Sequence, residues 1–261
     1  IYPIDVTVSE WDCTLESSSL NKTQRRFGIR MGLRYVKDLS RDRDWQRITA
    51  ARAERPFTTM TDFAHRTGLD DRRLRRLAEV GAFSAFEADR RSALWQMQGV
   101  GTSRDMSLPM SAEDRVPVFR SLSNFQTINW DYQFSGHSTH GHPLEPLREM
   151  LMAQGLPNVE RVLQMRDGQR VNFAGIVICR QRPSTASGVT FMTLEDESGF
   201  LNVVIWKQVF EDHVVLVKTA SFLGVSGKLQ IESQVAHLVA EQFWLPELKV
   251  HPESGGSRDF H

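Results

Sequence analysis

The hydrophobic pattern of this chain changes period once, near residue 168, from a helical spacing to a strand-like spacing. Five runs rich in Val, Ile and Phe follow, and a helical segment, KQVFEDHVVLVK, lies between the third and the fourth. Five short strands with a helix in that position have the order of an OB-fold, a small Greek-key barrel that often binds single-stranded nucleic acid or oligosaccharides. The pattern therefore predicts an OB barrel over residues 167–250.

The chain before this barrel is mostly helical. Residues 1–35 contain two strand-like runs around a Ser-rich turn, and residues 36–100 contain short helices joined by tight turns. Residues 101–166 combine a polar linker with a further helix, and residues 251–261 form a tail that we expect to be flexible. The predicted fold class is α+β and multidomain, with a helical region followed by a five-stranded β-barrel.

The composition favours a folded protein without a membrane span. Hydrophobic residues make up 40% of the 261 positions and charged residues 25%, which supports a packed core. No apolar run approaches the roughly 20 residues that cross a bilayer, and no secretory signal pattern opens the chain. Cys13 and Cys179 are far apart and outside any C-x-x-C pair, so we expect a reduced, cytoplasmic protein. Because the chain lacks an initiator Met, we expect it to be part of a longer protein.

The net charge of zero conceals an asymmetry. Residues 22–91 contain 18 Lys and Arg against 10 Asp and Glu, a net charge of +8, so the rest of the chain carries −8. Such a basic block is typical of a nucleic-acid contact, and it is also typical of a solvated helical surface rich in Arg.

Helix pairs in residues 36–100 are candidates for helix-hairpin-helix modules, which present backbone N–H groups to DNA phosphates, usually through a G-x-G hairpin. The first hairpin would be VKDLS, which contains Lys37 but no glycine, and the second would be TGLDD, which keeps only Gly68. The side chains that could contact phosphates electrostatically follow this second hairpin. They are Arg72, Arg73, Arg75 and Arg76.

Three consecutive acids, Glu195 to Glu197, raise the question of a Mg²⁺ site. A two-metal site needs carboxylates that converge from separate elements, whereas neighbours on one turn point in different directions. The acids lie between the second and third predicted strands, and Gly199 supplies the positive φ that a hairpin loop commonly needs. We therefore predict a solvent-exposed β-turn, with no metal site and no catalytic residue in this chain.

A second possible metal site is the histidine group of SGHSTHGHPLE. His137, His140 and His142 could seat Zn²⁺ only with a fourth ligand from elsewhere, and no Cys pair lies nearby. The Gly and Ser between them indicate a loop that leads into the following helix.

In the predicted barrel, Arg180 and Arg182 begin the loop between the first two strands. Phe191 on the second strand and Trp206 at the end of the third are candidates for stacking on the bases of a single strand. VTFMTL is apolar on both alternations, so the register stays open and either ring could instead belong to the core.

The sequence also resembles a known family. GLRYVKDL and ITAARAERPFTTMTDFAHRTGLDDRRLRRLAEVGAFSAFEADRRSALW are similar to the helix-hairpin-helix region of bacterial C-family DNA polymerases. ICRQRPSTASGVTFMTLEDESGFLNVVIWKQVFE closely resembles the OB domain of their error-prone branch, which is related to the replicative polymerase III alpha subunit. DYQFSGHSTHGHPLEPLREML is similar to the segment between the two. The RQRPSTASG loop favours the error-prone branch.

The resemblance implies that residues 1–35 are the end of the fingers region. It implies that the catalytic aspartates and their Mg²⁺ ions lie in a palm upstream of this chain, so no cofactor is expected here. It further implies contact with primer–template duplex by the helical region and with single-stranded template by the barrel. The implied protein partner is an inactive relative of Y-family polymerases that recruits the sliding clamp in damage-induced translesion synthesis, in the bacterial cytoplasm at the nucleoid.

Three alternatives stay open. The chain could be the same region of a replicative alpha subunit, although no strong clamp-binding motif is present. EDRVPVF, at residues 113–119, lies where such a motif would lie but lacks its Gln. The chain could also be an OB-fold adaptor that binds single strands, or one that binds only protein.

Overall fold

The structure is a computed structural model in which the chain forms two compact units, Ile1–Thr139 and His140–His261. The residues that it describes are 1–18, 26–102, 119–183, 188–232 and 235–260. Among these residues, no helix is long and apolar enough to cross a bilayer.

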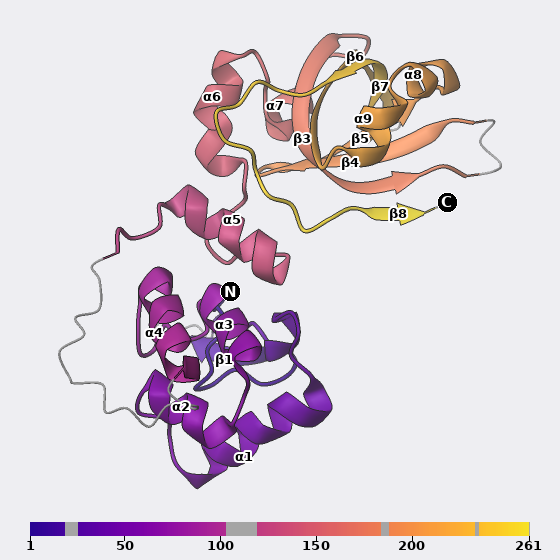
Figure 1. Cartoon of the computed structure of the whole chain (residues 1–261). Coiled ribbons are helices and arrows are strands. Elements are labelled where there is room, and N and C mark those ends of the chain that lie inside the picture. The colour runs from indigo at the N-terminus through magenta and orange to yellow at the C-terminus, as the bar shows by residue number, and fades with distance from the viewer. Residues whose placement is uncertain (19–25, 103–118, 184–187, 233–234, 261) are drawn as a thin grey trace. The chain divides into compact units, whose positions relative to one another are not determined.

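The first unit joins a two-stranded ribbon to a group of short helices (Figure 1). Strands β1 (Thr14–Ser18) and β2 (Arg26–Arg30) are antiparallel, and a 3-10 turn (Leu33–Tyr35) and a π turn (Arg41–Trp45) follow them. The helices are α1 (Gln46–Glu54), α2 (Met60–Thr67), α3 (Asp71–Glu79), α4 (Arg90–Thr102) and α5 (Asn124–Ser135).

These helices begin and end where terminal backbone groups find partners. The side chain of Thr59 accepts a hydrogen bond from the Asp62 N–H at the start of α2, and Asp70 does the same for the Arg73 N–H in α3, both at 3.0 Å. Gly68 ends α2 with a φ of 61°, a left-handed conformation that turns the chain into α3. The tight turn predicted from TGLDD is therefore present.

An aromatic group lies at the centre of the first unit's core. Phe63 is fully buried and contacts Phe57 and Phe83 edge to face, with ring centroids 4.9 and 5.2 Å apart. Leu74 and Leu77 of α3 enter the same core, as their helical spacing predicts. This packing directs the arginines of α3 away from the core.

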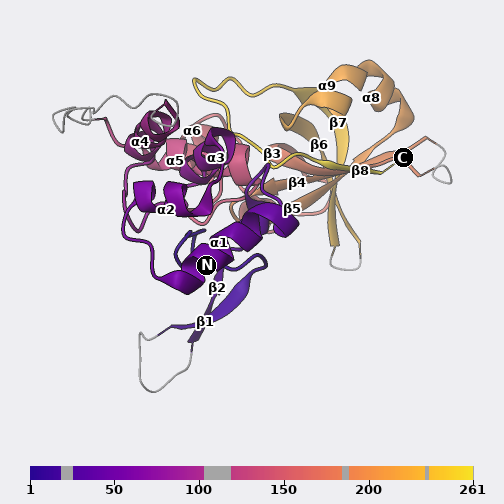
Figure 2. The same ribbon diagram turned by 60° about the horizontal axis from the view of Figure 1, so that its bottom comes forward.

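The second unit contains a closed five-stranded barrel, which confirms the predicted fold class (Figures 1 and 2). Neighbouring strands are antiparallel except β5 and β7, which are parallel, and β3 pairs with both β4 and β6 to close the barrel. Helices α8 (Lys207–Asp212) and α9 (Val214–Thr219) come between β5 and β6, where an OB-fold has its helix. The strands are β3 (Arg170–Gln181), β4 (Thr190–Asp196), β5 (Gly199–Ile205), β6 (Phe222–Glu232) and β7 (Val235–Trp244).

Irregularities in the pairing let the sheet curve into a barrel. The register of β3 against β4 shifts between Val177 and Cys179, and β6 shifts against β7 between Ser226 and Gly227. A Cβ atom on Gly227 would lie 2.1 Å from the Val239 carbonyl oxygen. The close backbone approach at this bulge therefore requires glycine.

The structure also settles the register that the apolar run VTFMTL left open. Met192 and Leu194 of β4 are buried in the barrel, and Phe191 and Thr193 face outward. On β5, Leu201 and Val203 are buried in the same way. The outer face of β4 and β5 is therefore formed by the residues that alternate with these buried ones.

Two parts of the chain differ from the expected organisation. The region expected to connect the domains, residues 101–166, is divided between the units, since α5 lies in the first and α6 (Arg148–Ala153) and α7 (Val159–Val162) lie in the second. The tail expected to be flexible instead carries β8 (Arg258–Phe260), which pairs in parallel with the end of β3. The pairing of β3 with β6 ends at Ile176, so β6 offers no strand partners to the backbone groups on that edge at the end of β3. Their need for partners explains the pairing with β8.

The acidic turn is a hairpin between β4 and β5, as predicted, but it is not simply exposed. The side chain of Asp196 has no exposed surface, and it accepts hydrogen bonds from the backbone N–H groups of Val159 and Ser198 at 2.8 Å. Arg148 donates to Asp196 at 3.2 Å and to Glu197 at 2.8 Å. The turn therefore holds α6 and α7 against the barrel. The expectation that all three acids lie in water was wrong.

We expect Asp196→Ala to lower the free energy of unfolding by about 2–4 kcal/mol, because it leaves a buried N–H group and part of the Arg148 charge without partners. Glu195→Ala, on the same turn, is expected to change it by no more than about 0.5 kcal/mol. Urea unfolding followed by circular dichroism measures both values. Equal effects of the two substitutions would contradict the fastening role of Asp196.

Candidate nucleic-acid interfaces

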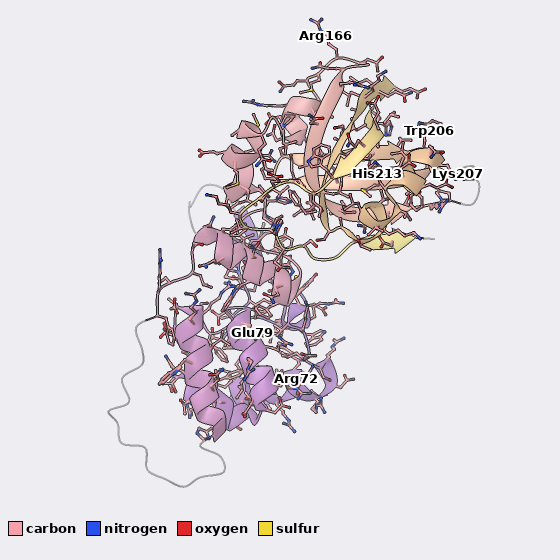
Figure 3. All side chains as sticks on the ribbon, turned by 45° about the horizontal axis from the view of Figure 1, so that its top comes forward. Arg72, Glu79, Arg166, Trp206, Lys207 and His213 are labelled. Carbon is pink, nitrogen blue, oxygen red and sulfur yellow. The ribbon has the colours of Figure 1, made fainter. Side chains whose placement is uncertain are left out.

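The arginines of α3 are the first candidate interface. They follow the Gly68–Asp70 turn, and Figure 3 labels Arg72 and Glu79 near the two ends of α3. A hollow of about 310 Å³ lies on one face of this helix. It is lined by Asp71, Arg72, Arg75, Arg76 and Glu79.

Asp38 of the first hairpin binds two of these arginines. Its carboxylate accepts hydrogen bonds from Arg72 at 2.9 Å and from Arg76 at 3.0 Å. The hydrogen bond from Arg76 and the positive charge of Arg72 lower the pKa of the Asp38 carboxyl. Asp38 has a φ of 70°, and among the described residues it alone combines a side chain with a positive φ. An aspartate thus stands in the conformation that glycine usually supplies in a phosphate-binding hairpin.

Arg73 has a different role, because it pairs with a buried carboxylate. Its guanidinium lies 2.7 Å from Asp44, whose side chain is almost fully buried, and it also pairs with Asp70. The hydrogen bond to Asp44 is the main reason that the pKa of Arg73 is raised. Arg73 therefore joins the π turn to α3, and this explains its position better than contact with DNA does.

The remaining predicted positions of the first unit also differ in whether their donor groups are free to bind a ligand. Lys37 donates through Nζ to the Gln133 carbonyl oxygen at 2.6 Å. The N–H group of Gly68 is bonded to Ala64 O, so this glycine shapes the turn and its N–H is not directed to a ligand. Arg75 is exposed and has no ion pair within the described part of the chain. Arg75, together with the outer part of Arg72, is the most accessible positive charge on α3.

The outer face of β4 and β5 is the second candidate interface. Phe191 is 41% exposed and Trp206 is 56% exposed, so neither ring belongs to the barrel core. Trp206 directly follows β5 and lies beside Lys207 at the start of α8 (Figure 3). Phe200, 60% exposed, pairs across the hairpin with Glu195 on the same face. Sequence reasoning missed Phe200, although its alternation with the buried Leu201 was the signal that could have found it.

Strand pairing places polar and basic groups beside these aromatic rings. One outward row runs across four strands through Phe191, Val204, Val239 and Lys228. The next row contains the hydrogen-bonding side chains Thr193, Asn202, His237 and Gln230. A surface with exposed rings, hydrogen-bonding groups and a lysine can stack bases and contact the backbone of a single strand.

The two arginines predicted for this interface have different surroundings. Arg180 is only 11% exposed; it donates to Val217 O at 2.6 Å and to Ser257 Oγ at 2.5 Å, and it also hydrogen-bonds to Ala220 O. These contacts hold α9 and the C-terminal segment against β3. Arg182 is exposed and lies over the Phe210 ring, 4.5 Å from its centroid. Arg182 is therefore available to a ligand, whereas Arg180 is occupied by the fold.

The histidines do not form a metal site in the structure as described. No group of three His, Cys, Asp or Glu side chains is arranged to hold a metal among the described residues. His137 donates through Nδ1 to Ser135 O at 3.0 Å, and His142 accepts through Nδ1 from Leu144 N at 3.1 Å. Burial lowers the pKa of both rings, which favours their neutral forms. The EDRVPVF segment lies outside the described residues except at its last position.

Two parts of the chain match known domain families. Residues 1–93 match the family described as a helix-hairpin-helix motif, and residues 171–246 match the family described as an OB-fold nucleic acid binding domain. A solved asparaginyl-tRNA synthetase from Pyrococcus horikoshii covers 30% of this chain and 20% of its own, at 22% identity and a TM-score of 0.27. That TM-score is too low to add to the fold assignment.

Curated relatives align with nearly the whole chain. An error-prone DNA polymerase of Pseudomonas syringae pv. tomato is 37% identical over 94% of this chain and 24% of its own length. One of Methylococcus capsulatus is 35% identical over 100% of this chain and 26% of its own length. These relatives confirm the resemblance to error-prone DNA polymerases, and the chain spans about a quarter of their length.

We expect Arg73→Gln to lower the free energy of unfolding by about 3 kcal/mol, because it leaves the buried Asp44 carboxylate without its main counter-charge. Arg75→Gln on the same helix is expected to change it by no more than about 0.5 kcal/mol. Thermal and urea unfolding of the two variants provide the comparison. If Arg73→Gln unfolds like the parent chain, the arginine does not join these elements.

Proposed function

We propose that this chain is a DNA-binding part of an error-prone DNA polymerase. In this proposal the first unit contacts duplex DNA through α3, and the barrel contacts the single-stranded template through β4 and β5. The proposal rests on three exposed rings, Phe191, Phe200 and Trp206, on the barrel face of β4 and β5 that OB-folds commonly use for nucleic acid. The names of the relatives that align with the whole chain support it.

The proposed activity of the full-length protein is DNA-directed nucleotidyl transfer during translesion synthesis after DNA damage. We propose that its catalytic carboxylates and Mg²⁺ ions lie in a palm outside this chain. This chain then supplies grip on the DNA and contacts with other proteins. A partner related to inactive Y-family polymerases, indirect contact with the sliding clamp and a cytoplasmic, nucleoid-associated location belong to the same proposal.

The contact with duplex DNA is proposed to be electrostatic. Arg72 and Arg75 lie on one helix face, two and five residues after the Asp70 cap of α3, and Arg72 is 70% exposed. Guanidinium groups in this arrangement can contact phosphates without reading the bases. The carboxylate of Asp38 competes with phosphate for Arg72 and Arg76, so the affinity of this face is lower than its count of arginines suggests.

We expect Arg75→Gln and Arg72→Gln each to weaken duplex binding equally for unrelated sequences and to flatten the slope of log affinity against log salt by about 0.9. Arg34→Gln is the matched control, because Arg34 is exposed in the same unit and pairs with Asp12. Asp38→Asn is expected to strengthen binding by releasing Arg72 and Arg76. Fluorescence anisotropy at several salt concentrations measures all four variants. Unchanged slopes for the two α3 variants would assign this face to another role.

Single-strand binding by the barrel has its own test. We expect Phe200→Ala and Phe191→Ala each to lower the affinity for oligothymidine by about 1–3 kcal/mol, the contribution of one stacked base, while the melting temperature changes little. Val215→Ala, at an exposed apolar position on α9, is the control.

The same titration distinguishes single-strand binding by the barrel from the alternative that the barrel binds only protein. If both ring variants bind oligothymidine as well as the control does, or if the parent chain does not bind it, the barrel is better explained as a protein-binding adaptor. Loss of binding together with a sharp fall in melting temperature would indicate that the rings stabilise the fold and do not bind the strand directly.

A further inference from the structure

The second unit has a cavity beside the two helices that follow β5. It is a hollow of about 380 Å³ where β3 ends and β4 begins, next to α8 and α9. This volume is large enough for one nucleotide or a smaller ligand. The hollow is lined by Arg180, Gln181, Arg182, Thr190, Phe210, Val217, Lys218 and Asp259.

The lining carries a surplus of positive charge. Arg180 and Asp259 pair with each other at 3.4 Å, so their charges offset. Arg182 and Lys218 have no ion pair within the described ranges of the chain. Both instead lie over the ring of Phe210, with Arg182 Cζ 4.5 Å and Lys218 Nζ 5.9 Å from its centroid. Two cations therefore line one hollow without a carboxylate partner among the described residues, which favours an anionic ligand there.

A buried hydroxyl group points to the same conclusion. Thr190 is only 3% exposed, and its Oγ1 atom has no hydrogen-bond partner among the residues that the structure describes. A buried polar group without a partner destabilises a fold, so such groups often mark a ligand site. Thr190 lines the hollow, and its hydroxyl, which has almost no accessible surface, reaches a ligand oxygen there only after rotation about the Cα–Cβ bond.

We propose that this hollow binds a phosphate group. Its donors are the Arg182 guanidinium, the Lys218 ammonium and the Thr190 hydroxyl, and a phosphate offers several acceptor oxygens and a negative charge to such a set. The phosphate has two possible sources, an internucleotide phosphate of a bound single strand or the phosphate of a free nucleotide. The first source rests on the proposed function of the barrel, and the second does not.

The test uses the 261-residue chain and follows backbone amide shifts in NMR titrations with two probes, a ten-residue oligothymidine and thymidine 5′-monophosphate. The variants are Thr190→Val, Arg182→Gln and Lys218→Met. The control is Arg166→Gln. Arg166 is an exposed cation just before the start of β3, whereas the hollow lies where β3 ends (Figure 3). We expect each pocket variant to weaken binding of at least one probe by about threefold or more, and the control to leave both unchanged.

Thr190→Val distinguishes a ligand-binding hydroxyl from a structural one. Because it replaces an unpartnered hydroxyl with a methyl group of similar size, we expect an unchanged or higher melting temperature together with weaker binding. Weaker binding of the oligonucleotide alone identifies the strand as the source, and weaker binding of both probes identifies a site for a phosphate monoester.

Two results would overturn the proposal. One is that all three pocket variants bind both probes as the control does. The other is that neither probe shifts the amides around the hollow. If the chain fails to bind oligothymidine but binds the monophosphate in this hollow, the single-strand function fails and the phosphate site stands.

Discussion

Closure of the barrel by the parallel pairing of β5 with β7 is the constraint on which the second unit depends. Once these strands pair and β3 bridges β4 and β6, each residue of the sheet faces either the core or the outside. The core takes Met192, Leu194, Leu201 and Val203, so Phe191 and Phe200 must stay exposed. The exposed rings are thus a consequence of the regular register of β4 against β5.

The first unit uses most of its arginines for its own structure. Arg73 neutralises the buried Asp44, Arg76 is shared between Asp38 and Glu79, and Arg66 pairs with Asp62. Burying a carboxylate is costly unless a positive charge and hydrogen bonds accompany it, so these arginines stabilise the fold before they can serve a ligand. A count of charges in residues 22–91 therefore overstates the positive potential available to DNA.

Much of this organisation could be predicted from the sequence. The strand order with its helix follows from the change of period, and the turn at Gly68 follows from the position of glycine between two helical patterns. The exposure of Phe191 could not be predicted, because β4 is apolar on both alternations and only pairing fixes its faces. Nor could the roles of Arg180 and Asp196, whose partners lie far away along the chain, at Val217, Ser257 and Arg148.

We propose that the outer face of β4 and β5 holds single-stranded DNA. Photocrosslinking of the chain to oligothymidine that contains one 5-iodouracil, followed by mass spectrometry of the linked peptides, tests it directly because this base links to aromatic rings in contact with it. We expect links at Phe191, Phe200 or Trp206. Links confined to other surfaces of the chain, or links unaffected by unlabelled oligothymidine in excess, would contradict it.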